Sequence, residues 1–201
     1  MYLPAHFAAP EAAALALMRA HPFVVLIAVD NGIPSISHVP VRVLDDGKRL
    51  QFHLARANPQ AGLLATEPAA TAVFHGPHAY VSPGWYAAPN VPTWNYAAVH
   101  ARGRVRALDD AATAALVAAL SRDYEGPAGL GEFEQSPAYA ALLRGIASFE
   151  LHVESCTAKF KLSQNRSAAD RAGVMAALAD DPRSEARAVA TLMQALAKSG
   201  E

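Results

Sequence analysis

Two hairpin signals near the N-terminus restrict the fold of this chain more than any other sequence feature. The apolar run 23–29 is followed by Asp30-Asn31-Gly32 and then by the alternating stretch 33–41. A second strand pair is predicted on either side of Asp45-Asp46-Gly47. Asn-Gly and Asp-Gly favour the type I′ turns that join antiparallel strands. We therefore expect an antiparallel sheet with a two-residue turn at each signal.

The rest of the chain alternates between strand and helix signals without a regular order. Further strands are expected at about 70–76, 79–82, 94–108 and 148–162, and helices at about 10–20, 58–66, 109–125, 137–145, 167–179 and 182–198. Parallel α/β sheets need strict strand–helix alternation, which is missing here. The pattern favours a small antiparallel barrel of about seven strands with helices around it. Gly103 interrupts a strand and is expected to mark a bulge.

Composition narrows the class of function. The formal net charge is −1 over 201 residues, so nucleic acid binding would need a local basic patch. The basic run 100–106 lies on a predicted strand, where we expect alternation to divide its charges between two faces. Cys156 is the single cysteine and is expected to pack inside the protein. No apolar run reaches membrane-spanning length, and a cytoplasmic location is expected.

Motifs of the common enzyme classes are missing from the sequence. There is no Walker A loop, dinucleotide fingerprint, nucleophile elbow or cysteine cluster, so no catalytic residue is predicted. Eight histidines are present, and His75 and His78 flank a Gly-Pro pair that we interpret as a turn, where both would face one ligand. Haem or metal is therefore an alternative ligand. No carboxylate has metal-ligand spacing, so no metal site is predicted.

The clearest binding signal is the stretch 52–60, where a strand ends in Arg56 and a helix begins two residues later. Asn58 is a helix cap, and free backbone N–H groups at a helix start attract anions. An arginine fork matches phosphate oxygens. The pattern is equally compatible with a phosphate site and with a surface arginine beside an ordinary cap.

Aromatic residues gather in the segment 74–96, which holds six of the fifteen in the chain. Aromatic clusters usually belong to the core. Here proline, glycine, asparagine and serine separate them, which favours a rim that faces a ligand or a dimer partner. The cationic stretch 159–167 follows the last strand and is a candidate anion site, with an ordinary solvated strand end as the alternative.

Five blocks of sequence resemble one known family. They are MYLPAHF, FHLARANPQ, FHGPHAYVSPGWY, VPTWNYAAVHARG and KLSQNR, in this order from Met1 to Arg166. The chain resembles the PaiB-type FMN-binding negative transcriptional regulators. Gly84 departs from the pattern, where serine is more usual. The departure affects only the local contacts of that loop.

The resemblance implies a mainly β fold with helices: an antiparallel split β-barrel of the FMN-binding type. It implies residues 1–166 as the barrel domain and residues 167–201 as a helical pair packed on the barrel or on a dimer partner. It also implies FMN as the cofactor and a homodimer with flavin at the subunit interface. The family label implies a negative regulator, acting through DNA or through a regulatory protein. A flavin-dependent oxidoreductase and a haem-binding barrel are the alternatives.

The resemblance also assigns cofactor-binding residues. Those matching the phosphate segment are His53, Arg56 and Asn58, with Ser37 and His38 as weaker candidates on the preceding hairpin. Those expected around the flavin ring are Trp94, Asn95, Lys161 and Gln164.

Overall fold

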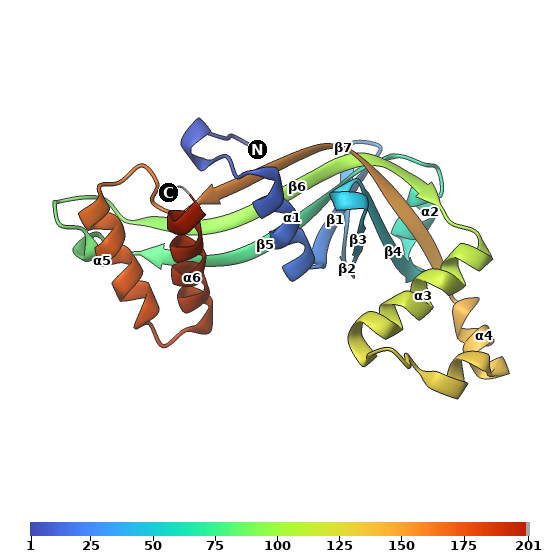
Figure 1. Cartoon of the computed structure of the whole chain (residues 1–201). Coiled ribbons are helices and arrows are strands. Elements are labelled where there is room, and N and C mark those ends of the chain that lie inside the picture. Colours follow the sequence, from blue (N-terminus) through green and yellow to red (C-terminus); the bar gives the residue numbers. More distant parts are fainter. Residues whose placement is uncertain (200–201) are drawn as a thin grey trace. The chain divides into compact units, whose positions relative to one another are not determined.

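The computed structural model describes the backbone of residues 1–199 and the side chains of residues 1–197 (Figure 1). The strands are β1 (Phe23–Asp30), β2 (Ile33–Pro40), β3 (Arg42–Leu44), β4 (Arg49–Ala55), β5 (Ala69–Val81), β6 (Thr93–Ala107) and β7 (Ile146–Lys161). The α-helices are α1 (Glu11–Ala20), α2 (Pro59–Leu64), α3 (Asp110–Glu125), α4 (Pro137–Leu143), α5 (Ala168–Ala179) and α6 (Ser184–Ser199). Short 3₁₀ segments are η1 (Ala5–Phe7), η2 (Asp45–Gly47), η3 (Pro83–Trp85) and η4 (Gly131–Gln135).

The strands form one sheet in the order β2-β1-β5-β6-β7-β4-β3, which confirms the predicted mainly β fold. Contacts divide the chain into two compact units. One holds residues 1–17, 75–99 and the chain from Thr157 onward, and the other holds residues 18–74 and 100–156. The division expected at residue 166 stays a prediction. None of the described helices combines the length and hydropathy needed to span a membrane.

The second unit is built on the β1–β2 hairpin. Alternate residues of β1 are buried, and the strand pairs antiparallel with β2, with Ile27 opposite Ile36. Asn31 and Gly32 have φ of 48° and 83°, the positive values that a type I′ turn requires. The predicted turn is therefore confirmed. β2 also approaches β4 within this unit.

The turn predicted at residues 45–47 is longer than expected. The β3–β4 ladder ends with Leu44 opposite Arg49, which leaves four residues in the loop. Residues 45–47 all have positive φ, and the Lys48 amide donates to the Asp45 carbonyl at 3.1 Å. Strand pairing was predicted correctly, but the two-residue turn was wrong because the register starts one residue further out on each side.

β5 is continuous through residues 75–78, so the Gly-Pro turn predicted there is wrong. Exposed or half-exposed side chains lie at odd positions up to His75 and at even positions from His78. This change of parity is what a β-bulge at Gly76 and Pro77 produces. Gly76 has no room for a side chain, because a Cβ there would lie 2.6 Å from Leu17 Cδ1 and 3.1 Å from the Ala97 carbonyl oxygen.

Gly103 also marks a place where two backbones meet. A Cβ at this position of β6 would lie 1.7 Å from the carbonyl oxygen of His152 on β7. Close strand approach thus explains this glycine. Cys156 on β7 is exposed, so its predicted packing role was wrong. It lies in an exposed run, residues 154–156.

Each unit has its own apolar core. In the second unit, Phe52 of β4 stacks on Phe149 of β7 with 5.8 Å between ring centroids. In the first unit, Phe160 and Leu162 at the end of β7 are buried, as are Val174 on α5 and Val189 on α6. α5 and α6 pack side by side (Figure 1).

Candidate functional site

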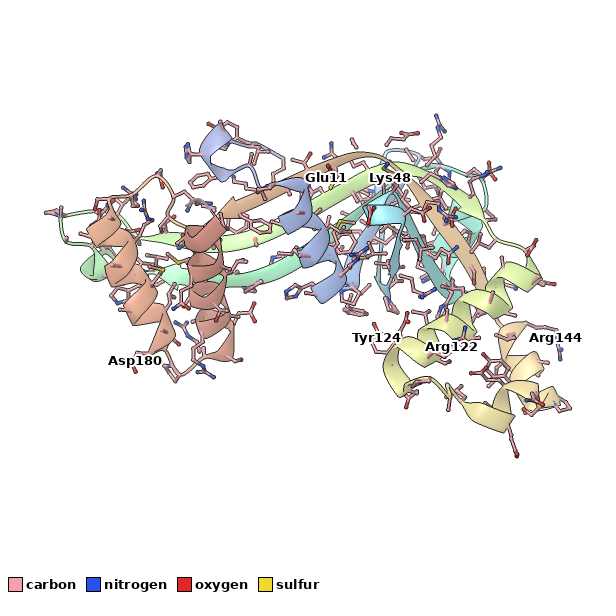
Figure 2. All side chains as sticks on the ribbon, viewed as in Figure 1. Glu11, Lys48, Arg122, Tyr124, Arg144 and Asp180 are labelled. Atoms are coloured by element: carbon pink, nitrogen blue, oxygen red, sulfur yellow. The ribbon has the colours of Figure 1, made fainter. Side chains whose placement is uncertain are left out.

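The junction between β4 and α2 holds the predicted phosphate residues. Arg56 donates from Nη2 to the Ile146 carbonyl at 2.7 Å and from Nε to the Arg144 carbonyl at 3.2 Å. Figure 2 labels Arg144 at the end of α4. These two bonds hold the guanidinium at the start of β7. Within the described chain its Nη1 has no recorded partner, so one side of the fork stays available.

Asn58 caps α2 as predicted. Its Oδ1 accepts from the Gln60 amide at 2.9 Å, and its Nδ2 donates to Ser37 Oγ at 3.2 Å. The structure therefore brings Ser37 to the junction. His38 lies on the other face of β2 and stacks on Phe23 at 6.2 Å, so it is directed away from Asn58. The six residues of α2 give it only a short dipole.

A cavity of about 220 Å³ lies beside Arg56, between α2 and the strands. Small residues line it, among them Ala61, Gly62 and Ala147. Ser148 also lines it: this residue is 2% exposed, and its buried hydroxyl has no hydrogen-bond partner within the protein. Buried hydroxyl groups are nearly always satisfied, so an unpaired one at a cavity indicates a ligand or water partner.

His53 lies directly opposite Ser148 in the β4–β7 ladder. Its buried Nδ1 also has no partner in the described protein, and burial lowers its pKa below the ordinary value of 6.5. Arg56 and Ser148 line the cavity, and His53 is the strand neighbour of Ser148 without lining the cavity itself. This donor set and the small cavity fit a phosphate group. Sequence reasoning missed Ser148, because a serine inside an alternating strand gives no signal of its own.

The predicted ring-side residues lie in the other unit. Trp94 is 51% exposed, and its ring lies 6.0 Å from His78 and 6.2 Å from Tyr80. The rings of His75 and His78 are 4.7 Å apart, and His78 Nδ1 lies 3.2 Å from Glu185 on α6. The bulge in β5 therefore places aromatic and imidazole rings together. Among the described residues, no group of three or more metal-ligating side chains gathers.

Lys161 holds the backbone next to Trp94. Its Nζ donates to the Trp94 carbonyl at 2.7 Å and to Thr93 Oγ1. Burial lowers the pKa of Lys161, and the nearby cations Lys159 and Arg166 lower it further. No carboxylate contributes to this shift, so the surroundings of the ammonium favour an added anion.

Asn95 and Gln164 are occupied within the protein. Asn95 is 1% exposed; its Nδ2 donates to Ser163 Oγ at 3.0 Å and lies 3.5 Å from Met193 Sδ. The Gln164 side chain accepts from the Leu162 amide at 2.7 Å and donates to the Phe160 carbonyl. The polar groups of both side chains therefore have partners within the protein.

The predicted site residues thus fall into two groups. Ser37, His38, His53, Arg56 and Asn58 belong to one unit, and Trp94, Asn95, Lys161 and Gln164 belong to the other. A role for each of them with flavin stays a prediction.

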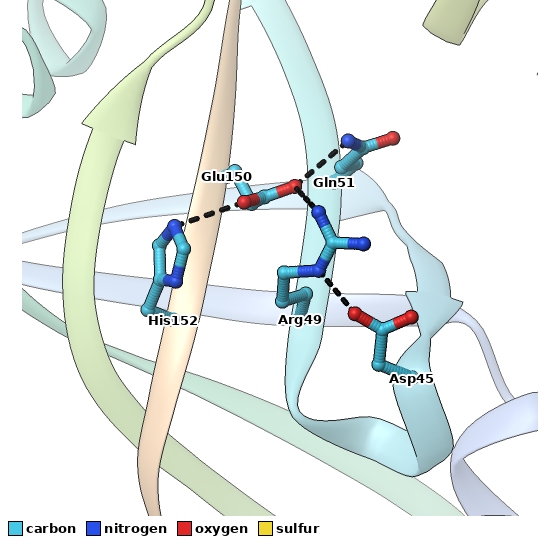
Figure 3. Close-up of polar contacts among 5 residues, drawn as sticks. All are labelled: Asp45, Arg49, Gln51, Glu150 and His152. Carbon is cyan, nitrogen blue, oxygen red and sulfur yellow. Dashed lines mark hydrogen bonds and ion pairs between the residues drawn. The ribbon is translucent and has the colours of Figure 1, made fainter.

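A buried carboxylate that the sequence did not reveal lies between β4 and β7. Glu150 accepts from Gln51 at 2.8 Å and from Arg49 at 3.2 Å, and it lies 2.9 Å from His152 Nε2 (Figure 3). Arg49 also pairs with Asp45. Buried charges need such partners, and this network ties the two strands together.

The arginines of β6 correct another expectation. Arg102, Arg104 and Arg106 are all exposed, because all three occupy even positions and share one face of the strand. The expected division of charge between faces was therefore wrong. None of the three forms an ion pair with a described carboxylate.

Comparison with known proteins identifies the family of this chain. A family model described as "Putative FMN-binding domain" matches residues 1–155. The chain is 31% identical over 201 residues to "Protease synthase and sporulation protein PAI 2" of Bacillus subtilis (strain 168), covering 96% of this chain and 97% of that protein.

Two solved structures share the fold. The FAD and haem binding protein of Mycobacterium smegmatis has a TM-score of 0.60 at 16% identity, with 77% of this chain and 72% of that chain covered. The conserved hypothetical protein Rv2991 of Mycobacterium tuberculosis has a TM-score of 0.62 at 12% identity, with 82% and 92% covered. These likenesses confirm the split-barrel class.

Proposed function

Because the chain belongs to the "Putative FMN-binding domain" family, which confirms the expected cofactor, we propose that it is a homodimeric FMN-binding regulator of transcription. The observation that carries the cofactor site is the cavity at Arg56, where the buried Ser148 hydroxyl has no partner in the protein. Bound FMN supplies a redox-active ring and a negatively charged phosphate.

Arg56 and Ser148 hold the phosphate in this proposal. Arg56 is already positioned by two backbone carbonyls, so little side-chain entropy is lost when its free Nη1 binds an anion. Asn58, Ser37 and His53 shape the same junction. His38 remains a weaker candidate because it lies on the opposite face of β2.

In the first unit, Trp94 is the proposed contact for a flavin ring. It is exposed, flat and flanked by other rings, and Lys161 adds positive charge beside it. Asn95 and Gln164 act indirectly, because their bonds to Ser163 and to the Leu162 amide hold the segment that follows Lys161, which itself bonds to the Trp94 carbonyl.

Titration of the purified protein with FMN tests the cofactor claim. We expect saturable quenching of flavin fluorescence and a protein-bound flavin absorbance spectrum. Trp94→Ala should weaken FMN binding, whereas the control Trp85→Ala, which changes the other tryptophan, should weaken it less. Unquenched FMN fluorescence with the folded wild-type protein would contradict the claim.

An exposed apolar face supports the proposed homodimer. Phe23, Val29 and Ile36 are 64%, 55% and 56% exposed and share one face of the β1–β2 hairpin. Val25 and Ile27 lie on the same face. Exposed apolar patches of this kind mark protein interfaces, and a second copy of the chain is the proposed partner.

Light scattering after size exclusion tests this interface. The double variant Val29→Lys/Ile36→Lys is expected to be monomeric where the wild type is dimeric. Val91→Lys is the matched control, because Val91 is 65% exposed and lies in the other unit. A double variant that stays dimeric would rule out this face.

The regulatory role rests on the sporulation-linked name of the Bacillus relative and on the β6 arginines. Arg102, Arg104 and Arg106 give a chain of net charge −1 a local row of unpaired cations, which suits phosphate contacts of DNA. We propose direct DNA contact through this row.

DNA binding measured across salt concentrations tests the role. The slope of log K against log salt concentration measures the number of phosphate contacts. Replacing the three arginines by glutamine should reduce the magnitude of this slope by up to about 2.7, since each phosphate contact contributes about 0.9. Arg187→Gln, on α6, is the control and should leave the slope unchanged. The opposite result is a wild-type protein that does not bind DNA but, with FMN bound, oxidises NADPH. It would favour the oxidoreductase alternative over the regulator.

A further inference from the structure

A second cavity lies at the helical pair α5–α6 and the segment that follows β7. Its volume is about 390 Å³, within the range of small-molecule sites. The described residues that line it lie between Leu162 and Ala197, after the end of the family match at residue 155. One lining residue, Gln164, is also a predicted flavin-side residue, but its side chain bonds to the Leu162 amide and the Phe160 carbonyl. The rest of the lining, including Arg171, has no role in the proposed FMN site.

The walls of this cavity are mostly apolar. Leu162, Met175, Met193 and Leu196 supply most of the lining. Methionine side chains are flexible and polarisable, and they adapt to ligands of different shape. Met193 is held from behind, because its Sδ lies 3.5 Å from the buried Asn95 amide. Such a cavity suits an aliphatic chain.

Among the described residues that line the cavity, Arg171 is the single charged one. Its Nη1 donates to the Arg166 carbonyl at 2.9 Å, which orients the half-buried guanidinium. Through the whole described chain Arg171 forms no ion pair. The adjacent Asp170 instead accepts from the Ala87 amide at 2.9 Å. An arginine without a carboxylate partner at an apolar cavity favours an anionic group on the ligand.

We propose that the α5–α6 cavity binds an amphipathic carboxylate, such as a medium-chain fatty acid. The carboxylate pairs with Arg171, and the aliphatic chain lies against Met175, Met193 and Leu196. Charge complementarity selects this occupant over a neutral or cationic one. In a transcriptional regulator, a ligand at this site would act as an effector. Binding of the carboxylate at this cavity does not itself depend on bound FMN.

Calorimetric titration of the full chain with decanoate, below its micelle-forming concentration, tests the proposal. We expect saturable binding at one site per chain. Arg171→Gln should weaken it about tenfold or more, because a charge-assisted hydrogen bond is lost. Decanol should bind the wild type more weakly by a similar factor. Ala197→Phe, which fills the cavity from an exposed helix position, should abolish binding of both.

Arg187→Gln is the matched control. Arg187 also donates to backbone carbonyls, at 2.8 Å, but does not line the cavity, so decanoate affinity should not change. Circular dichroism of each variant shows whether it is folded. No saturable binding to the wild type, or equal binding of decanoate and decanol, would overturn the proposal. FMN titration of the same samples tests the flavin site separately. Failure of decanoate binding would therefore not count against the flavin site, and failure of FMN binding would not count against the decanoate site.

Discussion

At the scale of single residues, unsatisfied polar atoms are the most informative feature of this protein. A buried hydroxyl without a partner costs about 1–3 kcal/mol, so a ligand or water that bonds to Ser148 would recover this free energy. Arg56, in contrast, has two partners that hold it in place and one nitrogen to spare. The sequence predicted Arg56 and Asn58 because their signals are local. Ser148 could not be predicted, because it reaches Arg56 only through the β4–β7 pairing.

Ser148→Ala should separate stability from binding. Removing an unpaired hydroxyl is expected to leave the free energy of unfolding unchanged or raise it by about 1 kcal/mol. FMN affinity should fall about threefold to tenfold, because a phosphate contact is lost. Urea denaturation and flavin quenching measure the two quantities. Ser121→Ala is the control, since Ser121 bonds only to the Val117 carbonyl within α3. A variant with lower stability and unchanged affinity would assign Ser148 a purely structural role.

His53 should make stability depend on pH. Burial lowers its pKa in the folded state below the ordinary value of 6.5, so the folded state resists protonation and the unfolded state does not. Its contribution is fully present above pH 6.5 and is lost as the pH falls from there toward the folded pKa. His53→Gln should therefore lose less stability than the wild type between pH 7.5 and 5.5 in urea denaturation. The exposed His6 gives the control, His6→Gln, and equal losses for all three proteins would refute the assignment.

At the scale of elements, sequence patterns predicted a strand or turn correctly where the local backbone geometry agreed with them. The β1–β2 hairpin was predicted because alternation and the Asn31-Gly32 turn agree. The continuous β5 was missed, because a Gly-Pro pair reads as a turn until pairing shows that a bulge accommodates it. The arginines of β6 were assigned to two faces although positions 102, 104 and 106 have one parity. That error was avoidable from the sequence.

Gly103→Ala should destabilise the protein strongly. The new Cβ would meet the His152 carbonyl at 1.7 Å, and a backbone atom cannot move away as a side chain can. We expect the free energy of unfolding to fall by about 1–3 kcal/mol or more, because this is the usual cost of overpacking a site. Gly62→Ala is the matched control, because a Cβ there meets nothing within 4 Å and α2 should gain slightly. Chemical denaturation compares the two, and a fully stable Gly103→Ala variant would show that β6 and β7 are not in close contact.

At the scale of the whole molecule, an antiparallel barrel was predicted from the order of strand and helix signals. The split-barrel type and the cofactor were predicted from blocks of sequence that resemble a family. Comparison with known proteins confirms both. The structure adds two surface features that the family resemblance did not predict. They are the exposed apolar face of the β1–β2 hairpin and the unpaired arginines of β6. The apolar face could not be identified without strand pairing, because it depends on which residues of β1 and β2 lie opposite one another. The shared face of the three arginines, in contrast, follows from their parity in the sequence. The α5–α6 cavity depends on how two helices pack beside the end of β7.

The most direct test of the account compares FMN with riboflavin, which lacks the phosphate, in the wild type and in Arg56→Gln. Fluorescence titration of each flavin gives the affinity ratio. The account predicts that the wild type prefers FMN by about tenfold or more, and that Arg56→Gln removes most of this preference while changing riboflavin binding little. Equal affinity of the wild type for the two flavins, or an undiminished preference in Arg56→Gln, would show that the phosphate is not bound at the β4–α2 junction.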